Sequence, residues 1–429
     1  MDTPITRHAR FTLSCIAALA SAGALAQEPN PYYIGASQSL AHESNLFRRD
    51  GTTLPVVSDT LSVTSLLAGL DQPIGRQRLF ADLSLRAGRF SNNKDLNYTG
   101  GGLQAGMDWE AADSLSGRLS YTLDRTLAPT GFDLGGPADA KNLQTTQEFV
   151  FRGSSSKVAP LAVEAGFVHR ALDYSLADAE VEALEFKQNT GNVGLLYRPG
   201  GALTLGIGVR RTEGSYPFGV PGTPVPPATE PAPGSGTPDD FTRNDVDLSA
   251  VWTPTGASTL TARLSRTREK HELRPTRDVS GNTGAISWNF KPTGKISLTT
   301  DYIRDTGAES TFIGGAPAGA TTQVVNSSPR ATTVQLRGDY ELTAKVQVQA
   351  FVRRLKRELV NNATPVPGTG EDTTSELRIG ANWAPLRSVL VGCSIGREER
   401  DASVGATANQ LSAPYSANTF RCLAQFRTQ

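Results

Sequence analysis

Charged side chains recur at every second position in many short segments of this 429-residue chain. Residues at alternate positions point to the same face of a β-strand. We therefore expect the charges of each segment to lie on one face of its strand. The charged faces of neighbouring strands would then form one surface. The predicted set is Asp82, Arg86, Arg118, Glu164, Arg170, Arg210, Asp247, Arg263, Asp301, Arg337, Asp339, Arg353, Glu376 and Arg378.

A surface of this kind could serve two purposes. Opposite charges on adjacent strands could form ion pairs that stiffen a wall, and Asp339 and Arg353 are predicted to pair in this way. Alternatively, a mixed-sign, hydrogen-bonding surface could let a polar or acidic polymer slide along it without sticking. The two interpretations are compatible, and the sequence leaves both open.

Other chemistry has little support. Beyond residue 26 the histidines are His42, His169 and His271, and none is spaced with a further ligand as a metal site requires. No nucleophile-elbow motif and no phosphate-binding glycine loop occurs. His169 shares its face with apolar residues of the predicted strand 159–174, which favours an interfacial position over a catalytic base. We expect no enzyme, cofactor or metal, and the balance of 42 basic against 42 acidic residues gives no support for nucleic-acid binding.

The elements that carry these charges have an apolar second face. In segment 79–87, leucine and alanine alternate with Asp82, Ser84 and Arg86. Similar alternation occurs at 115–123, 260–264, 334–339, 346–353 and 376–383. A soluble β-sandwich would also alternate, but here the polar face carries charges and glycine in strand after strand. This pattern is typical of a transmembrane barrel with a wet lumen and a lipid-facing exterior.

Turn lengths support an up-and-down antiparallel barrel. Short turns are predicted at 71–76, 109–115, 154–158, 197–203, 252–260, 290–296, 340–346 and 383–389. Long connections are predicted at 46–58, 91–97, 127–140, 175–182, 214–242, 271–278, 306–329, 360–372 and 401–414. These segments give an all-β fold of about 18 strands, with 16 as the alternative, short periplasmic turns and long extracellular loops. A barrel of this size can hold an aqueous channel, and aromatics at six of the short turns would form an interfacial girdle.

The ends and the longest loop complete the organisation. Residues 1–26 combine Arg7 and Arg10 with an apolar run and a small-residue cleavage site, which predicts a secretory signal peptide. Residues 27–429 would then form a single barrel domain in the lipid of a bacterial outer membrane. Segment 215–241 holds eight prolines and four glycines, and could be a solvated external loop, a constriction in the lumen or a partner-binding strap.

Cys393 and Cys422 are the two cysteines beyond the predicted signal peptide. They lie on the apolar faces of the last two predicted strands, and the centre of loop 401–414 lies midway between them. A symmetric hairpin would therefore place them opposite each other. A disulfide is feasible at a non-hydrogen-bonded pair, and two small apolar side chains packed together is the other interpretation.

The opening segment Tyr33–Arg49, which runs into Ser44-Asn45-Leu46-Phe47, resembles the first strand of barrels encoded in exopolysaccharide biosynthesis operons (the EpsL type). The recurring aromatic–x–Pro turns are similar to the repeat of that family and of the broader class of β-barrel porins. The resemblance implies an outer-membrane channel linked to export of a secreted polysaccharide, with periplasmic export components as partners. A general small-solute porin is the alternative, and a non-conducting structural or enzymatic barrel is less favoured.

Overall fold

A computed structural model describes most of the chain. The described residues are 30–52, 54–111, 114–129, 139–155, 160–220, 232–306, 330–361, 368–403 and 412–428. The predicted signal peptide and the long segment 307–328 lie outside these residues. Among the described residues, no helix has the length and apolar character needed to cross a membrane.

Nearly all of the described chain is β-strand. The strands are β1 (Tyr32–Glu43), β2 (Asp59–Ile74), β3 (Gln77–Phe90), β4 (Tyr98–Ala111), β5 (Leu115–Leu127), β6 (Leu143–Ser154), β7 (Leu161–Tyr174), β8 (Phe186–Gly200), β9 (Leu203–Val220), β10 (Thr237–Thr255), β11 (Ser258–His271), β12 (Val279–Thr293), β13 (Ile296–Asp305), β14 (Arg330–Thr343), β15 (Val346–Asn361), β16 (Gly368–Leu386), β17 (Val389–Ser403) and β18 (Tyr415–Arg427). In the described parts of the long connections lie one α-helical turn, α1 (Ala179–Glu182), and two 3-10 turns, η1 (Lys94–Leu96) and η3 (Pro275–Arg277).

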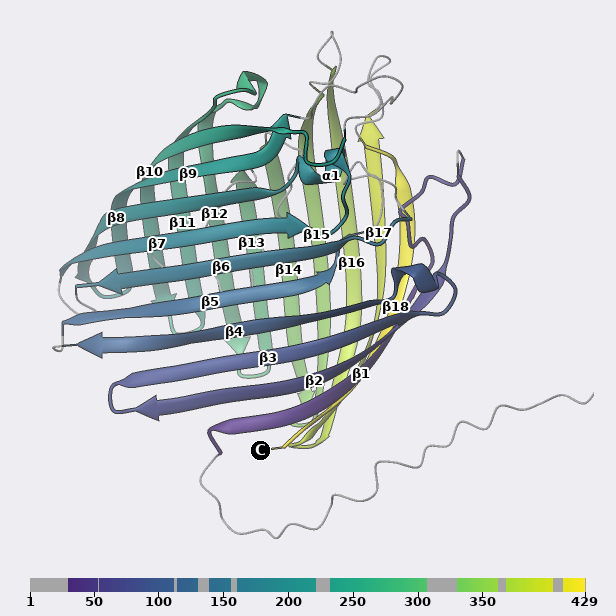
Figure 1. Cartoon of the computed structure of the whole chain (residues 1–429). Coiled ribbons are helices and arrows are strands. Elements are labelled where there is room, and N and C mark those ends of the chain that lie inside the picture. The colour runs from purple at the N-terminus through teal and green to yellow at the C-terminus, as the bar shows by residue number, and fades with distance from the viewer. Residues whose placement is uncertain are drawn as a thin grey trace, which may run out of the picture.

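The strands form one closed antiparallel barrel. Each strand pairs with its neighbours in sequence, and β1 pairs with β18 to close the sheet of 18 strands. Figure 1 shows this continuous wall, with the strands steeply tilted around the lumen. The predicted 18-stranded, up-and-down transmembrane barrel is therefore confirmed. Closure satisfies the backbone hydrogen bonds of every strand, as a hydrocarbon environment demands.

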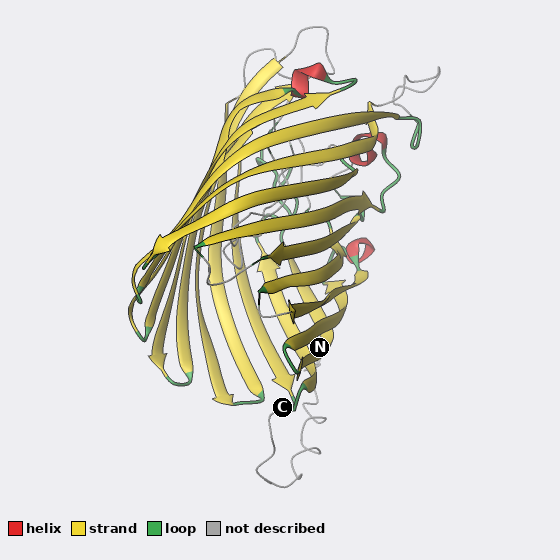
Figure 2. Cartoon of the chain, turned by 90° about the vertical axis from the view of Figure 1, so that its left-hand side faces the viewer, coloured by secondary structure: helices red, strands yellow, loops and turns green. Residues whose placement is uncertain are grey.

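Turn lengths are segregated between the two ends of the barrel. All eight predicted short turns join hairpins at one rim, such as the two-residue link between Ile74 and Gln77. The short helices lie at the other end (Figure 2), whereas β1 begins and β18 ends at the short-turn rim. Single-chain bacterial outer-membrane barrels share this asymmetry, with short turns facing the periplasm.

Alternation separates the two faces of the wall. Along β10, Arg243, Asp245 and Asp247 are buried, whereas Val246 and Leu248, which point to the opposite face, are about half exposed. The same pattern leaves large apolar side chains exposed around the barrel, and Ile395 retains 61% of its accessible surface. A soluble protein rarely exposes so much contiguous apolar surface, so this exterior is suited to lipid. Since single-chain barrels of this construction reside in bacterial outer membranes, the protein is located there.

Aromatic side chains border the apolar exterior at the short-turn rim. Tyr197, Trp252, Tyr340 and Trp383 each keep 42–52% of their surface exposed near the end of a strand. Trp and Tyr prefer the membrane–water interface, where the ring meets the headgroup region and the polar atom stays hydrated. These residues form the periplasmic aromatic girdle that the turn pattern predicts.

Two loops are shorter in the structure than the sequence predicts. Strand β9 continues to Val220 and β10 begins at Thr237, so much of the predicted loop 215–241 is a hairpin. Tyr216 and Phe241 are buried there with ring centroids 5.5 Å apart, and this packing extends the strands. The register shifts between Thr237 and Asp239, which accommodates Pro238. Similarly, β16 begins at Gly368, inside the predicted loop 360–372. The remaining proline-rich residues 221–231 lie outside the described residues.

The closing hairpin β17–β18 carries a disulfide. Cys393 lies directly opposite Cys422, and a bond joins their sulfur atoms with the Cα atoms 4.1 Å apart. Both residues share the outward parity of Ile395 and Phe420, which are strongly exposed. The bond therefore crosses the lipid-facing side of the last hairpin, one strand from the β1–β18 closure.

Candidate functional site: the charged inner wall

The structure places the fourteen predicted charged residues on the face opposite the exposed apolar exterior. They come from ten strands: Asp82 and Arg86 from β3, Arg118 from β5, Glu164 and Arg170 from β7, Arg210 from β9, Asp247 from β10, Arg263 from β11, Asp301 from β13, Arg337 and Asp339 from β14, Arg353 from β15, and Glu376 and Arg378 from β16. Whether they line a conducting path remains a prediction. The wall they form has a buried part and an exposed part.

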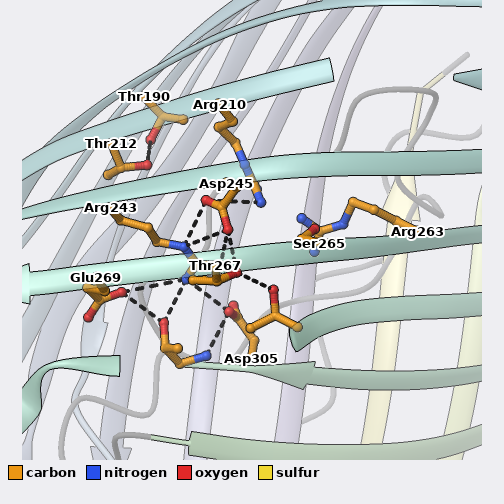
Figure 3. A network of polar contacts seen from close by, with 12 residues as sticks. Thr190, Arg210, Thr212, Arg243, Asp245, Arg263, Ser265, Thr267, Glu269 and Asp305 are labelled. Atoms are coloured by element: carbon orange, nitrogen blue, oxygen red, sulfur yellow. Dashed lines mark hydrogen bonds and ion pairs between the residues drawn. The ribbon is translucent and has the colours of Figure 1, made fainter. Parts of the chain in front are cut away.

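The buried part is centred on Asp245 of β10. Arg243 reaches this carboxylate with its Nε at 3.0 Å, and Arg210 with its Nη2 at 3.4 Å. Arg243 also donates from Nη1 to Asp305 of β13 at 3.0 Å. Figure 3 shows these side chains converging from several adjacent strands. Thus residues distant in sequence form one ion-pair network, because consecutive barrel strands are neighbours.

Hydroxyl groups add hydrogen bonds to two of the buried carboxylates. Thr267 donates to Asp245, and Ser265 donates to Asp247. Asp247 also accepts from Arg210 at 3.4 Å. The arginine and aspartate side chains of this network are at most 6% exposed. Buried charges are tolerated only when they are paired and hydrogen-bonded, which explains the density of partners.

The network continues toward the long-loop end. His271 lies between Asp239, 2.9 Å from its Nδ1, and Glu269, 3.2 Å from its Nε2. Asp239 also accepts from Arg274 at 2.7 Å. The rings of Tyr216 and Phe241 pack beside His271. This region joins the wall to the connection that carries η3, beside a cluster of packed aromatic rings.

A second buried group lies near the closure of the barrel. Arg357 of β15 forms a bidentate pair with Asp372 of β16, and Ser412 donates to the same carboxylate at 2.6 Å. Arg400 of β17 donates to Thr374 at 3.0 Å and lies over the ring of Tyr415. These contacts tie β15 to β18 on the inside of the wall.

On β3–β5 the inner wall is more exposed. Arg118 and Asp108 lie opposite each other, and the guanidinium donates from Nε at 2.5 Å. Arg86 donates to Asp124 across β4. The Arg118 side chain keeps 53% of its surface. Since this face points away from lipid, the exposed charges meet the lumen.

One predicted ion pair is wrong. Asp339 lies opposite Gln349, whereas Arg353 lies opposite Gln335, four residues farther along the hairpin. Arg353 pairs instead with Glu376 of β16, 2.9 Å away, and Arg378 binds the same carboxylate. The predicted face was right, but the predicted offset between the two strands was not.

Several central residues were not in the predicted set, notably Arg243, Asp245, Glu269, Asp305 and Asp372. The same alternation that marks Asp247 and Arg263 marks them when it is extended toward the long-loop end. Only Asp372 falls inside a predicted loop, 360–372, because β16 begins earlier than predicted, at Gly368. The other four lie within a few residues of predicted loops, beyond the segments in which the alternation was followed.

The groups on the inner wall can form hydrogen bonds and ion pairs with polar molecules. Among the described residues, no group of three or more His, Cys, Asp or Glu side chains is arranged to hold a metal ion. His169 lies on the outer face, where its Nδ1 contacts Asn189 at 2.8 Å. What the inner wall offers is a dense array of guanidinium, carboxylate and hydroxyl groups on a rigid sheet.

No known family model matches the sequence, and no curated protein is significantly similar to it. Among solved structures, the chain is similar to outer-membrane protein OpdK from Pseudomonas aeruginosa, with 14% identity, a TM-score of 0.45, and 92% of this chain and 98% of that chain covered. OccK9 (OpdG) from the same organism gives 15% identity, a TM-score of 0.45, and coverages of 92% and 98%. The FrpB iron transporter from Neisseria meningitidis gives 9% identity, a TM-score of 0.44, and coverages of 94% and 83%. At these scores, neither transport activity nor cargo can be carried over to this chain.

Proposed function

We propose that the protein is a channel of the bacterial outer membrane for small polar solutes. One observation carries this proposal: a closed wall of 18 strands is apolar outside and charged inside, with half-exposed arginines facing the lumen. A barrel of 16–18 strands is too wide for its own wall side chains to fill. Charges that remain exposed inside such a wall need water, and a hydrated lumen that spans a bilayer conducts.

The wall chemistry supports broad rather than steep selectivity. Guanidinium groups on β3 and β5 stand beside carboxylates that neutralise them, as Arg118 does with Asp108. Paired charges keep the lumen polar and hydrated without presenting a strong net field to a passing ion. We therefore expect a modest preference among small solutes.

Liposome swelling tests this function. The refolded barrel, reconstituted into vesicles, should admit neutral sugars, and the swelling rate should fall as solute mass rises. Vesicles that hold the same amount of folded protein but swell no faster than empty vesicles would refute the proposal. Folding is checked independently by resistance to proteolysis in the same vesicles.

Export of a secreted polysaccharide with periplasmic partners is the more specific role that the EpsL-type resemblance implies. Nothing in the described residues favours it over a small-solute channel, so it rests on the resemblance alone. Deleting the gene while measuring the extracellular polysaccharide would separate the two. Retained polysaccharide secretion together with lost solute entry supports the small-solute channel.

A further inference from the structure

A row of arginines crosses the outer face of the wall toward its long-loop end. Each of five alternate strands carries an exposed arginine eight residues beyond its first residue, as Arg211 lies beyond Leu203. The arginines are Arg211 on β9, Arg266 on β11, Arg304 on β13, Arg354 on β15 and Arg397 on β17. Two residues before each of them, on the same face, lies one of the strongly exposed side chains Val209, Leu264, Tyr302, Val352 and Ile395. We call these five residues the outer arginine row.

The row is level in the membrane. Arg266 lies opposite Asn282 of β12, whereas Arg304 lies two residues nearer the short-turn rim, opposite Gly284. Two strands span about 9.6 Å and two residues about 6.8 Å, so the Cα atoms of these arginines are about 12 Å apart on a line inclined by about 35° to the hydrogen-bonding direction. Strands of such barrels tilt by about 35–45°, so this line runs along the membrane plane. The same offset separates Arg304 from Arg354.

The height of the row places it at the far edge of the apolar band. Eight residues at ~3.4 Å each, along a strand tilted by about 40°, rise about 21 Å from the short-turn rim. The apolar band of an outer-membrane barrel is about 25 Å tall. Since the long loops lie beyond it, the row lies where the hydrocarbon of the outer leaflet meets the head groups. An arginine there lays its methylene stem along apolar surface and holds its guanidinium among the head groups.

The two arginines at the ends of the row are neutralised on their own strands. Glu213, two residues beyond Arg211, accepts from its Nε at 2.8 Å. Glu399, two residues beyond Arg397, accepts from its Nε at 2.9 Å. Residues two apart share one face of a strand, so each of these guanidinium groups has a carboxylate as its counter-ion.

The three central arginines have no such counter-ion. Arg266 donates from Nη1 to the amide oxygen of Asn282 at 3.3 Å. Arg304 and Arg354 form no ion pair or hydrogen bond with any described residue. Where the end arginines are followed by glutamate, Arg266 is followed on its face by Arg268 and Lys270, and Arg354 by Lys356.

Carboxylates near this sector point elsewhere or lie beyond the row. In the described chain, the outward positions of β11–β14 hold no acidic side chain, because Glu269, Asp301, Asp305, Asp339 and Glu341 have the opposite parity and face the lumen. Glu399 lies across β16 from Arg354 but binds Arg397. The other carboxylates on or beside these strands lie farther toward the long loops: Asp240, Glu272, Asp278, Glu358, Glu371 and Asp401. Of these, Glu358 binds Arg330 and Glu371 binds Lys356.

We propose that Arg266, Arg304 and Arg354 form a docking site for a lipid of the outer leaflet whose head group carries more than one phosphate. A guanidinium binds a phosphate with two parallel hydrogen bonds, and basic clusters at this depth attract anionic head groups. Arginines about 12 Å apart suit separate phosphates of one wide head group. The exposed apolar side chains below the row meet the acyl chains. This inference goes beyond the proposed channel function, since the row lies outside the wall and neither proposal requires the other.

Native mass spectrometry of the refolded full-length barrel, released from dodecyl maltoside micelles, tests the site by counting bound lipids. The probes are lipid A with two phosphates, its derivative with one phosphate, and phosphatidylglycerol. Lipid A with two phosphates should bind with a dissociation constant at least about tenfold below that of phosphatidylglycerol. The derivative with one phosphate should fall between them, because it leaves one guanidinium without a partner.

Two double variants locate the binding. Arg304→Gln with Arg354→Gln should raise the dissociation constant of lipid A with two phosphates by about tenfold or more, because two charge-assisted contacts are lost. Arg211→Gln with Arg397→Gln is the matched control. It removes the same charge from the same row, but from guanidinium groups that already hold a carboxylate, so the constant should change by less than about twofold. Resistance to proteolysis in the same micelles checks that both variants are folded.

Equal losses of lipid A binding in the two double variants would overturn the inference, because binding would then follow net charge and not the central arginines. Equal dissociation constants of the wild-type protein for all three lipids would overturn it as well, because the number of phosphates would then have no influence.

Discussion

Replacing Leu119 by arginine tests whether the apolar exterior lies in lipid. Leu119 is on β5, between the outward-facing Leu115 and Leu123, with Met107 and Phe151 opposite it on the adjacent strands. An arginine here would place a guanidinium among apolar neighbours. If the bilayer surrounds this face, the charge must be accommodated in hydrocarbon.

The height of the site sets the magnitude. Leu115 and Leu119 are four residues apart, which is about 14 Å along a strand at ~3.4 Å per residue. A strand tilt of about 40° reduces this to about 10 Å along the membrane normal. Leu115 and Leu123 therefore lie near the edges of an apolar band about 25 Å tall, and Leu119 near its middle. Arginine should cost about 2–4 kcal/mol at Leu119 and no more than about 1 kcal/mol at Leu115.

Urea titrations of folding into lipid vesicles would measure both variants. Leu119→Ala and Leu115→Ala serve as references for the loss of the leucine side chain. The reasoning is refuted if Leu119→Arg folds with the stability of Leu119→Ala. It is also refuted if the two arginine variants lose the same stability, because depth would then have no influence.

Two further predictions concern the inside of the wall and the closing hairpin. Arg243→Gln leaves buried carboxylates without their cation, so the free energy of unfolding should fall by about 3–5 kcal/mol; Arg211→Gln, which disrupts an exposed ion pair on the outer face, should change it by less than about 1 kcal/mol in the same urea titration. The Cys393–Cys422 bond closes a segment of 29 residues, and its reduction should lower stability by about 3–4 kcal/mol on the chain-entropy model. Mass spectrometry after alkylation without reductant should show both thiols protected, and modification of either would contradict the bond.

Much of the fold could be predicted because alternation has a strict period. In an up-and-down barrel each strand pairs with the next, so the list of strands also gives the topology. Asp82, Arg86 and the other inward charges follow from parity alone. The aromatic residues beside the short turns likewise mark the membrane interface, because Trp and Tyr prefer it.

Pairing within the wall could not be predicted in the same way. Shifting one strand by two or four residues against its neighbour leaves every side chain on its original face. Parity therefore cannot decide which of these registers two strands adopt. In the hairpin β14–β15, Asp339 lies opposite Gln349 and Arg353 lies opposite Gln335, so the two charges share a face but are four residues out of register. The strand ends were also misjudged at β9 and β10, since prolines suggested a loop where Tyr216 and Phe241 pack as part of a hairpin.

Conductance in planar lipid bilayers tests the central claim most directly. A hydrated, charged lumen through a closed barrel predicts stepwise increases in current as single barrels insert from a potassium chloride solution. Each open step should be ohmic and weakly selective. Folded, protease-resistant barrels that insert into the bilayer without any step in current would contradict the account, because the inner wall would then enclose no continuous water-filled path.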